Sequence, residues 1–573
     1  MKTTEEISLL IRKSLLLAFM LGLLEPAAAQ EGLAGPYLAA RHASFAREFQ
    51  TASKYLEQVV GEDSSNIDAM ETLILSKIAL GVFEDVYPLA DRVVDDGVDS
   101  QVAHVALITR AVRVQDFKAL VAQLEAQKGI GHQVVDGLLL AWANVGAGDA
   151  QAAFAIMDGL KDQEPSQGLV SYHRALMHHV MGDFEAAEAI FKDIGQQSGA
   201  LSRRAVIVRL QSLMAQGEFN QAEAVLEKYF GENLDPELLD LQADIKASRM
   251  PSERLIGSVA DGIAEVFFAI AKALSSEAQD EYSLMHARVA ELLSSQHVEA
   301  ILLAANVLEN MGQYELATKV YQEISPDNPI FHLAELGRAE ALRDSGNVEA
   351  AIEALENLTR SHPMMVRAYS TLGNILRYEE RYQDAIEVFN DAIALTDAKD
   401  QSAWRLFYAR GIAFERLNIW PKADRDFRKA LQLNPDQPLV LNYLGYSLVE
   451  KKIQLDEALA MIEKAVDLRP SSGFIVDSLG WVLFRMQQYE EAVPHLERAA
   501  ELEPVDPIVN DHLGDVYWAV GRKREAYFQW QRALSFDPED AEADRIRRKL
   551  DVGLDVVLQE EGADPLTVAQ SND

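Results

Sequence analysis

The stretch that decides the fold is residues 474–504, which read FIVDSLGWVLFRMQQYEEAVPHLERAAELEP. Apolar residues keep helical spacing in both halves of the stretch: Val476, Leu479 and Leu483, then Tyr489, Leu496 and Ala499. Gly480 is small enough to let two helices approach closely, and Ala499 suits a crossing point where a larger side chain would clash. Pro504 cannot continue the second helix and ends it. The stretch predicts a packed helix–turn–helix unit.

The same unit recurs along the C-terminal part of the chain. Three columns of residues repeat every 34 or 35 positions: Gly411, Gly445, Gly480 and Gly514; Ala430, Ala465, Ala499 and Ala533; Pro435, Pro470, Pro504 and Pro538. A period in this range is typical of helical repeats. A single helix pair cannot bury its apolar face, but stacked neighbours can, so we expect one continuous stack of pairs.

The columns resemble those of the tetratricopeptide repeat (TPR) family. Residues 369–395, YSTLGNILRYEERYQDAIEVFNDAIAL, match the family pattern at the following positions: Gly373, Tyr382, Ala385, Phe389 and Ala392. Weaker copies occur upstream, for example at residues 174–194 and 306–324. The resemblance implies an all-α fold, a right-handed superhelical solenoid of about 13 helix–turn–helix units over residues 37–538.

Changes in this rhythm suggest a domain organisation. We expect divergent N-terminal TPR-like repeats over residues 30–248 and regular repeats over 297–538. Between them, residues 249–296 read as an irregular helix pair with an enlarged loop at the polar stretch 275–280, where the solenoid bends. A boundary between two solenoid halves is the alternative. Residues 539–558 are predicted to form a capping helix over the last apolar face, and 559–573 a disordered acidic tail.

The N-terminus reads as a signal peptide over residues 1–29. Arg12 and Lys13 precede a short apolar run, and Ala27-Ala28-Ala29 forms an Ala-x-Ala cleavage site. The run is shorter than the roughly 20 residues of a transmembrane helix. An uncleaved anchor or a buried first helix is the alternative. Cleavage after Ala29 would place the mature chain in the periplasm; a peripheral position at the outer membrane stays open.

Composition restricts the partners. The formal net charge is −37, from 53 basic and 90 acidic residues, so the chain should repel nucleic acids and anionic membrane surfaces. The acidity fits solubility or a salty habitat, or else attraction of a basic partner. There is no cysteine, which excludes disulfides, thiolate zinc sites, a cysteine nucleophile and a lipid-modified N-terminal cysteine.

Motifs for catalysis and metal binding are absent from the sequence. It contains no phosphate-binding loop, no Gly-x-Ser-x-Gly elbow and no His-Glu-x-x-His pair. The one histidine cluster, His173, His178 and His179, has spacings that place His173 poorly on the face of the other two. We therefore predict a chain that is not an enzyme, with no catalytic residue, metal site or cofactor.

The resemblance also implies where a partner binds, because in this family the first helices of successive units line a concave surface. The pattern assigns these positions to the groove: Tyr408, Asn442, Tyr446, Asp477, Trp481, Phe484, Asp511, Asp515 and Trp518. Rings beside carboxylates suit an extended segment with apolar and basic side chains. The family's carboxylate clamp needs Lys and Asn there, whereas this sequence has Asn442, Asp477 and Asp511, which argues against that binding mode. The alternative for Trp481 and Trp518 is that they only fill space between helices.

The C-terminal third is similar to a group of exported bacterial TPR proteins. The shared residues are His512-Leu513-Gly514-Asp515, Trp518 and Gly521-Arg522. Relatives of this kind act as adaptors for a carboxyl-terminal processing protease, which implies a periplasmic adaptor that captures client proteins. A scaffold for outer-membrane or polysaccharide-export assembly is the alternative. Those relatives are lipoproteins, whereas this chain has no cysteine to modify.

Overall fold

A computed structural model describes residues 33–126, 128–160, 166–197, 201–231, 234–251, 254–397, 399–563 and 566. These residues form 31 α-helices and one 3-10 helix, and none of them belongs to a strand. The predicted all-helical fold is confirmed. The predicted signal peptide and most of the acidic tail lie outside the described residues.

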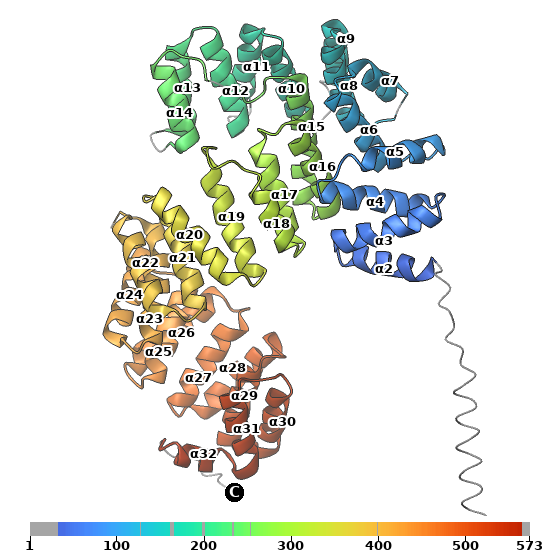
Figure 1. The fold of residues 1–573 in the computed structure, drawn as a ribbon. Coiled ribbons are helices and arrows are strands. Elements are labelled where there is room, and N and C mark those ends of the chain that lie inside the picture. Colours follow the sequence, from blue (N-terminus) through green and yellow to red (C-terminus); the bar gives the residue numbers. More distant parts are fainter. Residues whose placement is uncertain are drawn as a thin grey trace, which may run out of the picture. The chain divides into compact units, whose positions relative to one another are not determined.

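The helices belong to two compact units, one ending at Ala354 and one beginning at Leu355, so the boundary falls within α20 (Val348–Ser361). The first unit contains α2 (Ala34–Phe45), α3 (Phe49–Glu62), α4 (Ile67–Ala79), α5 (Val86–Asp95), α6 (Gln101–Arg113), α7 (Phe117–Glu125), α8 (Gln133–Ala147), α9 (Ala150–Leu160), α10 (Gln167–Val180), α11 (Phe184–Gln197), α12 (Arg203–Ala215), α13 (Phe219–Phe230), α14 (Pro236–Lys246), α15 (Val259–Ser276), α16 (Asp280–Leu293), α17 (Val298–Asn310), α18 (Tyr314–Tyr321) and α19 (Phe331–Asp344). Most consecutive helices pack side by side, as α2 and α3 or α10 and α11 do (Figure 1), whereas α14 and α15 do not.

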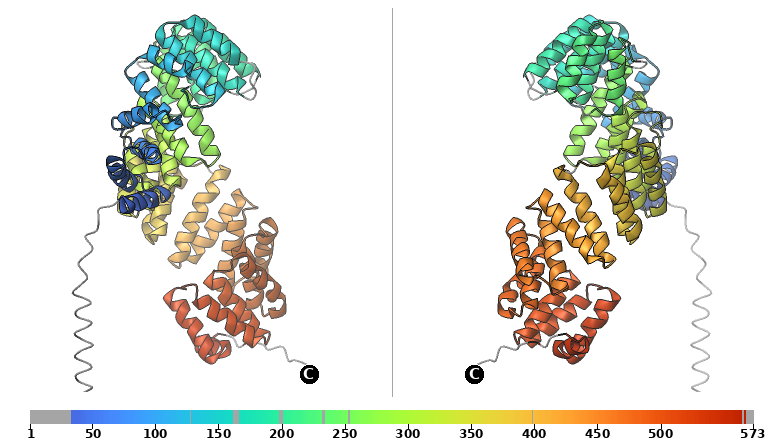
Figure 2. Two further views of the ribbon diagram at one scale, coloured as in Figure 1. Left: turned by 90° about the vertical axis from the view of Figure 1, so that its right-hand side faces the viewer. Right: turned by 90° about the vertical axis from the view of Figure 1, so that its left-hand side faces the viewer.

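The irregular region of the first unit differs from the sequence prediction. The predicted enlarged loop spans 275–280, but α15 continues to Ser276 and α16 begins at Asp280. Ala278 reverses the chain in a left-handed conformation, with φ of 57°, so a three-residue connection is enough. The long α15–α16 pair packs against helices from far upstream, α15 on α8 and α10, and α16 on α4 and α6 (Figures 1 and 2).

A buried polar network joins α10, α12, α15 and α17. Arg204 donates from Nε to Glu265 at 2.7 Å and also pairs with Glu299, and His297 lies 3.2 Å from Glu265. Burial alone would raise the pKa of Glu265, but the hydrogen bond from His297 and the charge of Arg204 lower it to about 2. This charged network therefore fixes α15 against its neighbours only while Glu265 is ionised.

The second unit has a regular alternation of first and second helices. It contains α21 (Val366–Tyr378), α22 (Tyr382–Ala394), the 3-10 helix η1 (Gln401–Ala403), α23 (Trp404–Arg416), α24 (Trp420–Leu433), α25 (Pro438–Glu450), α26 (Leu455–Leu468), α27 (Gly473–Arg485), α28 (Tyr489–Leu502), α29 (Pro507–Ala519), α30 (Lys523–Leu534), α31 (Asp540–Val552) and α32 (Leu554–Glu560). At Gly480, an added Cβ would lie 2.4 Å from Cγ of Leu496. The glycine column thus marks the close approach of paired helices, as the sequence indicated.

The C-terminal cap consists of two helices. The sequence predicted one helix over 539–558, but Gly553, with φ of 86°, ends α31 and starts α32 in a new direction. Ile546 of α31 and Leu554 and Val557 of α32 are buried. Both helices therefore cover apolar surface. A residue with positive φ cannot lie inside a continuous α-helix, so Gly553 divides the cap into two helices.

Candidate functional site

The predicted groove residues all lie on first helices of the second unit. Tyr408 lies on α23, Asn442 and Tyr446 on α25, Asp477, Trp481 and Phe484 on α27, and Asp511, Asp515 and Trp518 on α29. Among these first helices, α25 packs on α27 and α27 packs on α29. Helix α23 packs on α21 and α24 instead. We call the face formed by α25, α27 and α29 the first-helix surface.

Trp481 is at the centre of this surface and is only 7% exposed. Its ring stacks on the His512 ring, with centroids 3.9 Å apart and planes 13° apart. Its Nε1 donates to Glu450 at 2.8 Å. The side chain therefore links α25, α27 and α29 and forms a wall of the surface.

Trp518 is 9% exposed and is covered by the C-terminal cap. Its Nε1 donates to Asp555 of α32 at 2.8 Å. A Cβ built on Gly553 would lie 2.4 Å from the ring. This geometry supports the alternative in which Trp518 packs between helices.

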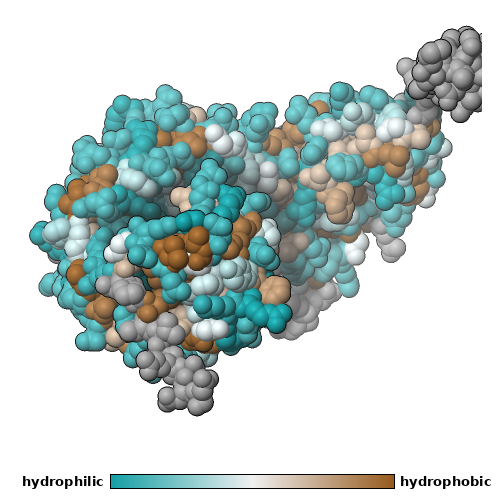
Figure 3. Space-filling model, turned by 90° about the horizontal axis from the view of Figure 1, so that it is seen from below, coloured by the Kyte–Doolittle hydropathy of each residue, from teal (hydrophilic) through white to brown (hydrophobic). Residues whose placement is uncertain are grey.

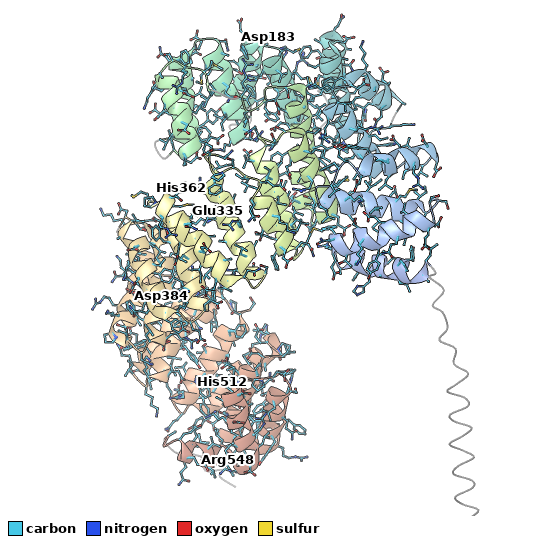
Figure 4. All side chains as sticks on the ribbon, in the orientation of Figure 1. Asp183, Glu335, His362, Asp384, His512 and Arg548 are labelled. Atoms are coloured by element: carbon cyan, nitrogen blue, oxygen red, sulfur yellow. The ribbon has the colours of Figure 1, made fainter. Side chains whose placement is uncertain are left out.

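The carboxylate of Asp477 is also satisfied within the protein. His512 donates from Nδ1 to Asp477 at 2.9 Å, and both side chains are buried. Burial alone would lower the pKa of His512, but the negative charge of Asp477 raises it above the usual value. Figure 4 labels His512 among the side chains of the last repeats.

Asp511 and Asp515 share one buried cation. Nζ of Lys549, from α31, lies 2.7 Å from the Asp511 carboxylate and 2.6 Å from the Asp515 carboxylate, and Trp530 donates to Asp515 at 2.9 Å. Burial raises the pKa of Asp511 in spite of Lys549. The sequence suggested that these carboxylates contact basic side chains of a ligand. In the structure they are already bound by internal partners.

Two cavities remain open beside Trp481. They have volumes of about 390 and 350 Å³ and share Trp481, Arg485, Arg545 and Glu561 in their walls. The first also has an apolar lining from Val449, Leu455 and Phe484. Arg485 lies 3.2 Å from Glu450, and Arg545 lies 2.7 Å from Glu561. The charged lining of the two cavities therefore has both signs, and each of these two guanidinium groups is paired with a carboxylate.

Sequence reasoning missed a set of exposed apolar residues on the same surface. Leu439, Phe474 and Ile508 are each the second residue of a first helix, and they are 43%, 55% and 43% exposed. Their spacing follows the 34–35-residue period of the glycines, so the register alone could have identified them. Elsewhere the surface is mainly hydrophilic with separate hydrophobic patches, as Figure 3 shows from below.

The histidine cluster of the first unit is part of its packing. His173 accepts from Trp142 Nε1 at 3.2 Å, and burial lowers the pKa values of His173 and His179 to about 4. His178 Nδ1 lies 2.9 Å from the Asp183 carboxylate. Within the described ranges, no group of three or more His, Asp or Glu side chains could hold a metal ion, and no helix there is long and apolar enough to cross a membrane.

Known proteins resemble parts of the chain. A family model described as tetratricopeptide repeat matches residues 336–403 and 478–543. The TPR repeat-containing protein PA4667 of Pseudomonas aeruginosa is 26% identical over 166 residues, covering 29% of this chain and 27% of that protein. The human protein O-mannosyl-transferase TMTC1 is 26% identical over 170 residues, covering 30% of this chain and 19% of that protein.

Among solved structures, a chain of the APC/C hetero-tetramer Cut9-Hcn1 is similar over 92% of this chain and 97% of its own length, with 14% identity and a TM-score of 0.38. The matches to the two sequence relatives described above cover less than a third of the length of each relative. The sequence match to tetratricopeptide repeats is thus established for residues 336–403 and 478–543.

Proposed function

We propose that the chain is a non-catalytic adaptor that binds other proteins on its first-helix surface. The observation that supports this is the pair of cavities flanking Trp481, together with exposed apolar residues in register on three successive first helices, of which Ile508 lines the second cavity. Exposed apolar groups in a regular array favour a protein ligand over a small molecule. Repeat proteins use such extended surfaces for binding.

The spacing of the array suits an extended segment. Packed helices are about 8–10 Å apart, and a polyproline II segment advances about 9.3 Å over each turn of three residues. A ligand with an apolar side chain at every third position could therefore contact Leu439, Phe474 and Ile508 in turn. The charged lining has both signs, and Arg485 and Arg545 are already paired with Glu450 and Glu561, so the apolar side chains of the ligand carry the recognition.

Site-directed photo-crosslinking tests the proposal. Phe474 is replaced by a benzoyl-phenylalanine in the full chain, and the matched control has the same replacement at Phe528 of α30, which is 67% exposed. Irradiation in cells should give adducts with a partner from position 474 and not from position 528. Equal adducts at both positions, or adducts at position 528 alone, would mean that the first-helix surface is not the binding site.

The cellular setting is part of the proposal. Export with cleavage after Ala29 would place the chain in the periplasm, and the likeness of residues 512–522 to exported adaptors supports capture of clients for a carboxyl-terminal processing protease. N-terminal sequencing of the mature protein should begin at Gln30; intact Met1 in the cytoplasm would contradict export. Cell-wall hydrolases or the protease among the adducts would support the adaptor role, and outer-membrane or polysaccharide-export components the scaffold role.

A further inference from the structure

We propose that the first unit has a second binding site, for a lysine or arginine side chain on an extended segment of a partner protein. The site is a cavity of about 510 Å³ between α12, α14, the start of α17 and the connections at 254–255 and 325–330. It is built from other helices than the first-helix surface. Its existence does not depend on the function proposed above.

The lining of this cavity is apolar on several sides. Ile207 of α12, Leu241 of α14 and Val298 of α17 are buried beneath it, and Leu255 and Ile330 are half-buried. The aliphatic stem of a lysine or arginine covers such surface while its charged head stays near water. The lining therefore suits a long basic side chain better than a short polar one.

Carboxylates surround the apolar lining: Glu237, Asp240, Asp244, Glu299 and Asp327. Three of them already have cations from outside the lining, Glu237 with Arg203, Asp244 with Arg249 and Glu299 with Arg204. The carboxylates of Asp240, on α14, and Asp327, in the 325–330 connection, form no ion pair or hydrogen bond with any described residue. Two unpaired carboxylates from separate elements thus line a cavity that also has apolar walls, and both are open to a cation from a ligand.

The connection at 254–255 is fixed in place. Gln211 of α12 is buried, and its Oε1 accepts from the backbone N of Leu255 at 3.0 Å. Ile256 is buried next to it. Arg254 also lines the cavity, but its guanidinium lies over the Phe184 ring, 5.4 Å from the centroid. This wall of the cavity is therefore preformed. Its one cationic side chain, Arg254, already has the Phe184 ring as a partner.

The cavity arises where the repeat pattern is interrupted. After α14 the chain forms no second helix on it and instead runs across α12 before α15 begins. In a regular repeat the next helix would pack into this space. The interruption leaves the cavity open in the described part of the chain.

Peptide binding to the full chain tests the proposal. The probe is a fluorescein-labelled hexapeptide of alternating leucine and lysine, and its acidic counterpart has glutamate for lysine. Asp240→Asn with Asp327→Asn is compared with Asp95→Asn and Asp96→Asn, an exposed pair on and after α5 that does not line the cavity. Both double variants change the net charge equally, so long-range attraction by the acidic chain changes equally.

Fluorescence anisotropy should show at least a fivefold weaker Kd for the basic peptide in the cavity variant and less than a twofold change in the control. Circular dichroism should be unchanged in both, since all four carboxylates are exposed. Equal weakening in the two variants would overturn the site. Tighter binding of the acidic peptide would assign the cavity to Arg254 instead. Displacement of the peptide by 1,5-diaminopentane at equal concentration would make a free diamine, and not a protein segment, the occupant.

Discussion

Replacing Lys549 by Met tests how the C-terminal cap is held on the last repeat. Lys549 is fully buried, and its Nζ contacts the Asp511 and Asp515 carboxylates at 2.6–2.8 Å. Methionine keeps much of the volume of the side chain but removes the cation. The variant leaves two carboxylates close together with only the more distant Arg545 as a shared cation, 3.5 Å from Asp515 and 3.7 Å from Asp511.

The expected cost is large and local. Removing one partner of a buried ion pair costs about 3–5 kcal/mol, and damage in a repeat array stays near its site. Amide hydrogen exchange in α29 and α31 should therefore become about 100-fold faster or more, because about 1.4 kcal/mol corresponds to a factor of ten. Helices α21 to α24 should exchange at their original rates.

The pH dependence gives a second readout. Burial already raises the pKa of Asp511, and loss of Lys549 would raise it further. A carboxylate whose pKa is raised in the folded state binds protons more readily folded than unfolded, so folding becomes more favourable as the pH falls towards the unfolded value of about 3.9. The deficit of the variant should shrink between pH 8 and pH 5.

The matched control is Lys464→Met. Lys464 pairs with Asp436 at 2.5 Å, but both side chains are at least half exposed, so the loss should stay below about 1 kcal/mol. Equal exchange rates in α29 and α31 of the two variants would show that the buried cation does not hold the cap. A deficit that grows as the pH falls would refute the assignment of the loss to uncompensated carboxylates.

Three further predictions concern packing. Glu265→Gln should destabilise the first unit at pH 7, as measured by urea denaturation. Because the pKa of Glu265 is lowered in the folded protein, its ionised carboxylate adds stability above the unfolded pKa of about 4.3, and this stability is lost as the pH falls towards 2. The variant should therefore lose less stability than the original chain between about pH 4.3 and pH 2. Gly480→Ala should lower the melting temperature by an amount equivalent to about 1–3 kcal/mol, since its Cβ would meet Leu496; an unchanged melting curve would contradict a close helix approach. Replacing Trp481 and Trp518 together by Ala should lower thermal stability by circular dichroism before partner capture fails, and weaker capture at unchanged stability would instead make these rings ligand contacts.

Local periodicity explains why the helix pairs could be predicted from the sequence. The glycine at position 480 and its equivalents have a direct physical role, visible in the 2.4 Å that would separate an added Cβ from Leu496. The α15–α16 pair shows where this reasoning stops. Its packing on α4, α6 and α8 joins segments more than a hundred residues apart along the chain, and nothing in a 34-residue period specifies such a contact.

The helix positions of the predicted groove residues could be read from the sequence, but the partners of their side chains could not, because those partners are remote in sequence. The register placed Asp511 and Asp515 on a first helix, which the structure also does. It could not show that Lys549 pairs with both of them, because that lysine belongs to α31, which lies beyond the last repeat column. Once these carboxylates are internally paired, the exposed apolar residues of the first-helix surface are the groups left to contact a ligand. The charge of a groove residue read from sequence therefore predicts a ligand only when the residues that pack against it are also known.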